Sequence, residues 1–110
     1  MKALKYKIWV EEEGEMFLGH GRAALLEAID REGSISAAAR SMKMSYKKAW
    51  TLIDAVNRSA KEPVVITTAG GKDGGGTVVT PYGKTLIAAF ETINQNCWEF
   101  LDKQLAEINI

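Results

Sequence analysis

The chain has 110 residues, of which 46% are hydrophobic and 25% are charged, and its 14 Lys and Arg residues are balanced by 14 Asp and Glu residues. This length and composition suit one compact domain and exclude an intrinsically disordered chain and a two-domain enzyme. The longest apolar run covers only residues 86–90, where a membrane-spanning helix needs about 20, so we expect neither a transmembrane helix nor a signal peptide.

The zero net charge hides an uneven distribution of charge along the chain. Residues 34–58 carry five basic residues and one acidic residue, whereas residues 85–110 carry one basic residue and four acidic residues. A fold that keeps these segments apart makes a polarised molecule with a basic middle. The single cysteine, Cys97, cannot form an internal disulfide, which favours a reducing compartment and predicts a cytoplasmic protein.

The N-terminal residues predict a β-hairpin. Apolar and polar residues alternate along Leu4–Val10, which is the pattern of a half-buried strand. A second short strand, Met16–Leu18, can pair with it through a Glu-Gly turn. We assign the acidic residues of this region, from Glu11 to Glu15, to the turn rather than to a cation site, and we expect Trp9 to serve packing.

A helix is expected next, over about residues 21–32. Its apolar residues Leu25, Leu26 and Ile29 recur at helical spacing, and Gly33 can adopt the left-handed conformation that ends a helix. His20 is the only histidine and has no cysteine nearby in the sequence, so we expect it to solvate or cap the entrance to this helix. We therefore predict no metal, no cofactor and no enzymatic activity.

Two short helices joined by a brief turn follow, over about residues 34–60. Ser34 or Ser36 can cap the first of them, which is rich in alanine, so another helix can cross it closely. Ser45 can cap the second helix, which must end before Pro63. Two such helices with about three to four residues between them form the helix-turn-helix pattern.

The second helix of this pair has an outer face that suits DNA. With Ala49, Ile53 and Val56 turned inward, a step of about 100° per residue leaves polar and basic residues on the outside. A helix fits the major groove, where its first turns reach base edges, so the base-reading candidates are Tyr46, Lys47, Trp50 and Thr51. Basic residues beside this face set the affinity for DNA by contacting its phosphates. The phosphate-contacting candidates are Arg40, Lys43, Lys48 and Arg58. The Asp54 carboxylate could accept a hydrogen bond from a cytosine amino group, or it could hold a neighbouring basic side chain in place.

A second β-hairpin is expected at about residues 64–80. The β-branched segments Val64–Thr68 and Thr77–Val79 flank a loop with five glycines, Gly70, Gly71, Gly74, Gly75 and Gly76. This loop is either a DNA-contacting wing, with Lys72 near a phosphate, or a disordered tip, and we favour the wing. The run Gly83-Lys84-Thr85 resembles the end of a P-loop, but the earlier glycine that a P-loop requires is Val78 here, which excludes a P-loop.

A long helix completes the chain, over about residues 81–108. Thr80 and Pro81 supply an N-cap and a first-turn proline. Apolar residues form one stripe along it, namely Leu86, Phe90, Ile93, Cys97, Leu101, Leu105 and Ile108. The helix is longer than a domain of this size needs, so the stripe is the candidate dimer interface.

Several of these motifs together resemble one known family. The segments Gly19-His20-Gly21-Arg22, Ser45-Tyr46-Lys47-Lys48-Ala49-Trp50, Gly70-Gly71-Lys72-Asp73-Gly74-Gly75-Gly76 and Thr80-Pro81-Tyr82-Gly83 are similar to the N-terminal DNA-binding domain of molybdate-responsive transcriptional regulators, the ModE family. The resemblance implies a winged helix-turn-helix that dimerises through its last helix, and also through its N-terminal strands, and that binds operator DNA. The same resemblance adds Ser45 to the base-reading candidates and Ser36 to the phosphate-contacting candidates.

One departure from the family limits what the resemblance implies. Full-length members carry molybdate-binding domains after the long helix, whereas this sequence stops at Ile110. We therefore do not expect molybdate or tungstate to bind this chain. The chain is either a stand-alone regulator, which Met1 slightly favours, or a piece cut at a domain boundary.

The sequence thus predicts an α+β, mainly α, winged helix-turn-helix as a single domain over residues 1–110, with an N-terminal β-hairpin, a Gly-rich wing and a long C-terminal dimerisation helix. The predicted function is that of a homodimeric, sequence-specific transcriptional regulator bound to double-stranded operator DNA. The alternative is a protein-interaction module that pairs with another regulator through its C-terminal amphipathic helix. The sequence leaves open the operator, the sign of regulation and any effector.

Overall fold

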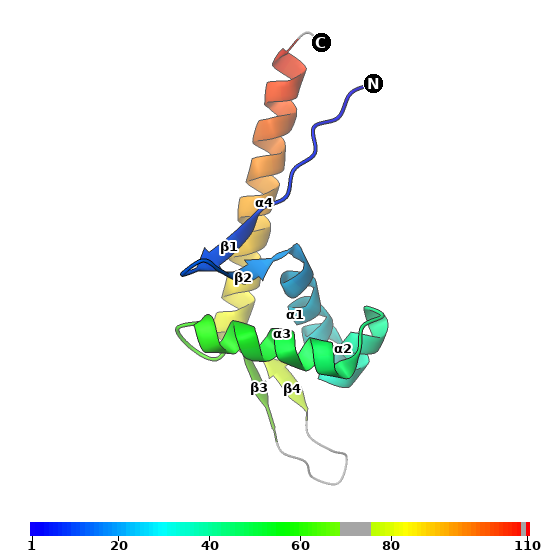
Figure 1. Cartoon of the computed structure of the whole chain (residues 1–110), viewed down its shortest axis with the longest axis vertical. Coiled ribbons are helices and arrows are strands. Elements are labelled where there is room, and N and C mark those ends of the chain that lie inside the picture. Colours follow the sequence, from blue (N-terminus) through cyan, green and yellow to red (C-terminus); the bar gives the residue numbers. More distant parts are fainter. Residues whose placement is uncertain (69–75, 109) are drawn as a thin grey trace.

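A computed structural model describes residues 1–68, 76–108 and 110 of the chain. Its elements run in the order β1 (Trp9–Glu12), β2 (Glu15–Gly19), α1 (His20–Glu32), α2 (Ile35–Ser41), α3 (Tyr46–Ser59), β3 (Val65–Thr67), β4 (Thr77–Val79) and α4 (Pro81–Glu107). Figure 1 shows α1, α2, α3 and the β1–β2 and β3–β4 hairpins gathered around the first part of α4, the rest of which extends away from them. This is a mainly helical α+β fold of the winged helix-turn-helix type, as the sequence predicted.

The N-terminal hairpin is present, but its first strand begins later than expected. Strand β1 starts at Trp9 rather than at Leu4, and pairs antiparallel with β2 around a turn in which Glu13 and Gly14 have positive φ angles of 49° and 83°. The preceding residues lie along α4 instead: the Tyr6 ring packs against Trp98 with 4.4 Å between the ring centroids and 54° between the ring planes. The alternation at Tyr6, Lys7 and Ile8 therefore belongs to an extended segment packed on α4, since alternate side chains of an extended chain point to opposite sides.

Helix α1 forms the centre of the core. Leu25, Leu26 and Ile29 are fully buried, and the helix ends at Gly33, which has a φ of 78° and donates its N–H to the Ile29 carbonyl at 2.8 Å. A non-glycine residue would be strained there. The predicted end of this helix is thus confirmed.

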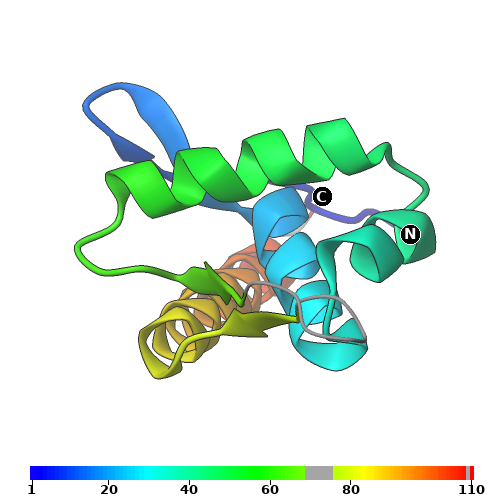
Figure 2. The ribbon, with the colours of Figure 1, turned by 90° about the horizontal axis from the view of Figure 1, so that it is seen from below.

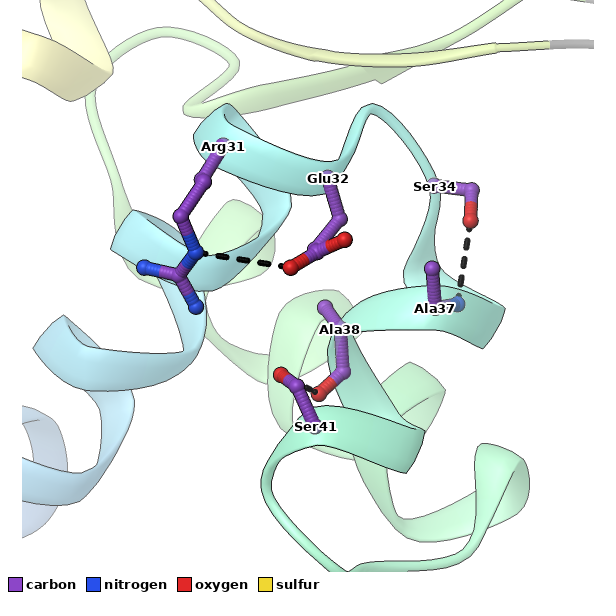
Figure 3. Close-up of polar contacts among 6 residues, drawn as sticks. All are labelled: Arg31, Glu32, Ser34, Ala37, Ala38 and Ser41. Carbon is purple, nitrogen blue, oxygen red and sulfur yellow. Dashed lines mark hydrogen bonds and ion pairs between the residues drawn. The ribbon is translucent and has the colours of Figure 1, made fainter.

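Helix α2 starts at once after this turn (Figure 3). Ser34, and not Ser36, is its N-cap, because the Ser34 hydroxyl oxygen accepts the Ala37 N–H at 3.0 Å. The Ser41 hydroxyl donates to the Ala38 carbonyl at 2.8 Å near the other end. Ala38 and Ala39 are buried, and such small side chains let α2 contact α1 and α3 closely.

A tight turn leads into α3. Lys43 has a φ of 56° in this turn, which is an uncommon conformation for a residue with a side chain. Ser45 caps α3, as predicted, by accepting the Lys48 N–H at 3.0 Å. Ala49, Ile53 and Val56 face the core, so the opposite side of α3 is left to solvent.

The second hairpin is fixed to the helices at two points. Strand β3 is shorter than predicted, whereas β4 has its predicted bounds, and the two strands pair Val65 with Val79 and Thr67 with Thr77. The Thr77 N–H donates to the Gly33 carbonyl at 3.0 Å, at the α1–α2 connection. The Asn57 side chain of α3 accepts the Val64 N–H at 2.8 Å and donates to the Val65 carbonyl at 3.0 Å. Asn57 therefore sets the position of the hairpin relative to α3.

The first part of helix α4 anchors it in the core. The Thr80 hydroxyl accepts the Gly83 N–H at 2.9 Å and donates to the Pro63 carbonyl at 2.7 Å, and Pro81 follows in the first turn. Within α4, only Gly83, Ile87 and Phe90 are buried. Among the described residues, no helix is both long and apolar enough to cross a membrane.

Candidate nucleic-acid interface

Helix α3 presents its outer face on one side of the molecule. Figure 2 shows it running along that side, next to the N-terminal hairpin, with α2 close to its N-terminal end. All five base-reading candidates are exposed, namely Ser45, Tyr46, Lys47, Trp50 and Thr51. The two aromatic rings are open to a ligand, because Tyr46 is 56% exposed and Trp50 is 50% exposed.

Two of these side chains already make local hydrogen bonds. The Ser45 hydroxyl oxygen is occupied as the N-cap, but its hydrogen remains available to an acceptor. The Thr51 hydroxyl donates to the Lys47 carbonyl at 2.8 Å, so toward a base edge it offers only an oxygen acceptor and a methyl group. Lys47, Tyr46 and Trp50 keep their side-chain donors free of partners within the described part of the chain.

The structure decides between the two roles left open for Asp54. A carboxylate oxygen of Asp54 lies 3.1 Å from Nε of Arg58, one helical turn away. Asp54 therefore holds a basic side chain in place. The Arg58 and Asp54 side chains are 71% and 42% exposed, so this ion pair adds little stability, and the other guanidinium nitrogens of Arg58 can still meet a phosphate.

The phosphate-contacting candidates surround the N-terminal half of α3. Ser36 and Arg40 of α2, Lys43 of the turn and Lys48 of α3 are all exposed. Within the described ranges, no carboxylate pairs with these cations or with Lys47. Four unpaired positive charges in one region make an anion-attracting surface.

Part of the predicted wing lies outside the described residues. These are Gly70, Gly71, Lys72, Gly74 and Gly75, and nothing in the structure bears on them. Gly76 is described: its N–H donates to the Thr68 hydroxyl at 3.0 Å and its carbonyl accepts the Thr68 N–H at 2.9 Å. These two bonds extend the β3–β4 pairing by one step beyond Thr67 and Thr77.

The apolar stripe of α4 divides into two parts. Phe90 is only 5% exposed and lies in the core of its own chain, and Leu86 packs against that core, so the prediction that Phe90 forms an intermolecular interface is corrected. Ile93 and Ile108 are 50% and 53% exposed, whereas Cys97, Leu101 and Leu105 are half-buried. The predicted stripe did not include Phe100, which is 61% exposed.

This outer part of α4 forms an apolar hollow with the N-terminal segment. The hollow has a volume of about 430 Å³, and its lining includes Tyr6, Ile8, Ile93, Phe100 and Leu101. The Tyr6 hydroxyl donates to the Asn94 carbonyl at 2.8 Å. Desolvation, together with Cys97 and Asp102 nearby, raises the pKa of Tyr6 above its ordinary value, so the phenol stays a neutral donor.

Sequence reasoning also missed two polar residues that position the site. Arg22 donates from one guanidinium nitrogen to the Met16 carbonyl at 2.8 Å and to the Phe17 carbonyl at 3.3 Å, which ties β2 to α1. Asn57 was noted only as part of a motif. Neither role has a signal in the sequence, because the partners are backbone groups. The described residues contain no cluster of three His, Cys, Asp or Glu side chains that could hold a metal ion.

Comparison with known proteins gives a consistent set of relatives. The chain is 44% identical over 92 residues to the molybdenum transport protein ModE of Azotobacter vinelandii, which is 84% of this chain and 34% of that protein. It is 33% identical over 95 residues to the transcriptional regulator ModE of Haemophilus influenzae, and the matched region covers 86% of this chain and 37% of that protein. It is 38% identical over 81 residues to the DNA-binding transcriptional dual regulator ModE of Escherichia coli, and the matched region covers 74% of this chain and 31% of that protein.

The chain thus spans about a third of the length of the curated relatives it matches. No protein-family profile matches it.

Proposed function

Since the homologues of this chain are molybdenum-responsive transcriptional regulators of the ModE family, we propose that it is a DNA-binding domain that regulates transcription by binding double-stranded operator DNA as a homodimer. The observation that carries the proposal is the outer face of α3, where exposed aromatic and basic side chains lie beside cations that have no carboxylate partner in the described ranges. The further proposals are that residues 1–110 act as one domain and that the protein works in the cytoplasm.

The proposed docking places the first turns of α3 in the major groove. Tyr46, Lys47 and Trp50 then face base edges, with Ser45 and Thr51 at the same end of the helix. Ser36, Arg40, Lys43, Lys48 and Arg58 meet the phosphates on either side. A Lys ammonium can donate hydrogen bonds to guanine acceptors, and a Thr methyl group can contact a thymine methyl group. The outer face of α3 therefore offers both polar and apolar contacts to bases.

The wing is proposed to contact the flanking backbone or the minor groove. Support comes from the attachment of the hairpin to α3 through Asn57 and to the α1–α2 connection through Thr77, which fixes the wing's base relative to the reading helix. Glycines at its tip allow the backbone to approach a narrow groove, and Lys72 supplies a charge.

The homodimer is proposed to form through the outer part of α4. Ile93, Phe100 and Ile108 are exposed apolar side chains on a helix that extends past its own core, which is costly unless a partner covers them. Two recognition helices related by a two-fold axis would read half-sites about 34–36 Å apart, or a multiple of that distance. A chain that stays monomeric and lacks DNA affinity would favour the interaction module instead.

Selection of bound fragments from a pool of random duplexes tests the proposal and gives the operator. We expect enriched sequences with two symmetry-related half-sites, because a symmetric dimer selects a palindrome. Enrichment of no sequence, at salt concentrations low enough for binding, would contradict sequence-specific recognition.

Substitutions on α3 should separate base reading from phosphate binding. Lys48→Ala is expected to weaken binding to selected and random duplexes alike and to reduce the salt slope by about one. Lys47→Ala or Thr51→Ala should mainly reduce the preference for the selected sequence, at a cost of about 1–3 kcal/mol for each lost base contact. Anisotropy titrations on both duplexes at several salt concentrations measure these effects. Equal losses on both duplexes for all three variants would refute the assignment.

A further inference from the structure

A second hollow lies between the N-terminal hairpin and the helix-turn-helix. It has a volume of about 260 Å³ and is lined by residues from six segments: the N-terminal segment, β1, β2, the start of α1, the α2–α3 turn and α3. The apolar part of its lining consists of Trp9, Met16, Met42, Met44 and Leu52. Three of these five are methionines, whose flexible and polarisable side chains adapt to the shape of a ligand.

Basic side chains make up the charged part of the lining. Lys7, Arg22 and Lys48 line the hollow, and no Asp or Glu does. None of these three cations has a carboxylate partner within ion-pair distance among the described residues. Glu11, the nearest acid along β1, accepts a hydrogen bond from the Trp9 indole at 2.8 Å. One Arg22 nitrogen is already held by the Met16 and Phe17 carbonyls, but no carboxylate neutralises the three charges in the described part of the chain. An apolar floor beside such cations is complementary to an anion that has an apolar body.

We propose that this hollow binds a small organic anion, such as an aromatic carboxylate. Its volume is slightly below the usual range for ligand pockets, about 300–1,000 Å³, so the occupant has one or two rings. A DNA phosphate would satisfy the cations but would leave the methionine and leucine side chains uncovered. The apolar floor therefore favours a free organic anion over the DNA backbone.

Binding in this hollow would be coupled to DNA binding, a consequence that rests on the proposed function. Lys48 lines the hollow and is also a proposed phosphate contact, while Met42 and Met44 belong to the turn that sets α3 against α2. A bound carboxylate would draw the Lys48 ammonium away from DNA. The ligand should therefore weaken DNA binding severalfold, and DNA should weaken ligand binding by the same factor.

Methyl NMR on protein labelled at the methionine methyl groups tests the binding without DNA. The chain has four methionines, and Met16, Met42 and Met44 line the hollow whereas Met1 does not. With 2-naphthoate as the probe, we expect ring-current shifts at those three methyl signals and none at Met1. The neutral analogue 2-naphthamide should bind at least about tenfold more weakly, since it lacks the charge that the three cations recognise.

Two matched variants complete the test. Lys48→Gln should weaken binding of 2-naphthoate severalfold, whereas Lys103→Gln, the same change on the exposed end of α4, should leave it unchanged. Both lysines are exposed and outside every ion pair found among the described residues, so both variants are expected to fold. The proposal is overturned if no methionine signal shifts at millimolar probe, if Met1 shifts as much as the others, or if the amide binds equally well. Unchanged DNA affinity at saturating probe would overturn the coupling.

Discussion

Gly83→Ala should lower the melting temperature of this protein markedly. A Cβ at position 83 would lie 2.5 Å from the Val64 carbonyl oxygen and 2.8 Å from a Val79 methyl group, and neither atom is the free end of a flexible side chain. The Val64 carbonyl also accepts the Thr80 N–H at 2.9 Å, so moving it disturbs the cap of α4. We expect the free energy of unfolding to fall by about 1–3 kcal/mol or more. The melting temperature should fall by about 4–8 °C for each kcal/mol lost.

Gly21→Ala provides the control for this prediction. Gly21 also lies in the first turn of a helix, but a Cβ built there has no atom within 4 Å. Alanine is the better helix former, so this variant should be as stable as the parent or more stable by up to about 1 kcal/mol. Thermal unfolding followed by circular dichroism at one fixed protein concentration compares the three proteins. Equal melting temperatures for both variants would show that α4 does not pack against Val64 and Val79 in this way.

Phe100→Asp should convert the proposed dimer into a monomer. The Phe100 side chain is 61% exposed, so its loss costs the isolated chain little, but it lines the apolar hollow on α4 that a second copy would cover. A carboxylate in a buried interface would lose its water without gaining a partner. A monomer engages only one half-site, so the affinity for the full operator should fall by about 10²–10⁴-fold.

Ala106→Asp is the matched control, because it adds the same charge on the same helix. At about 100° per residue, position 106 lies about 120° around α4 from Phe100 and on the side opposite Cys97, in the middle of the apolar stripe, and it is exposed. Light scattering at micromolar concentration should find a dimer for the parent and for Ala106→Asp, and a monomer for Phe100→Asp. A parent protein that is monomeric, or a Phe100→Asp dimer with unchanged DNA affinity, would contradict the proposed interface.

The helix-turn-helix could be predicted closely because its signals are local. The Ser45 cap, the left-handed Gly33 and the Thr80-Pro81 pair each act on their own backbone neighbourhood, and each has the predicted role. Of the two serines predicted for the cap of α2, Ser34 takes that place. The inward residues of α3 were predictable for the same reason, since helical periodicity fixes which side chains share a face.

Features that depend on distant parts of the chain could not be predicted in this way. Periodicity identifies apolar residues on α4 but does not say whether they face their own core, as Phe90 does, or solvent, as Ile93 does. The start of β1 was misplaced because the segment before Trp9 packs on α4, which no local pattern indicates. The roles of Arg22 and Asn57 depend on backbone partners that only the fold brings close.

Titration of a fluorescent duplex with the parent protein at low salt tests the central claim most directly. The account predicts binding with a dissociation constant well below about 10⁻⁴ M for any duplex, because even non-specific binders usually reach 10⁻⁴–10⁻⁶ M at physiological salt. It also predicts tighter binding to a selected palindrome and an affinity that falls linearly with salt on logarithmic axes. Failure to bind any duplex more tightly than about 10⁻⁴ M would contradict the claim that α3 is a DNA-reading helix.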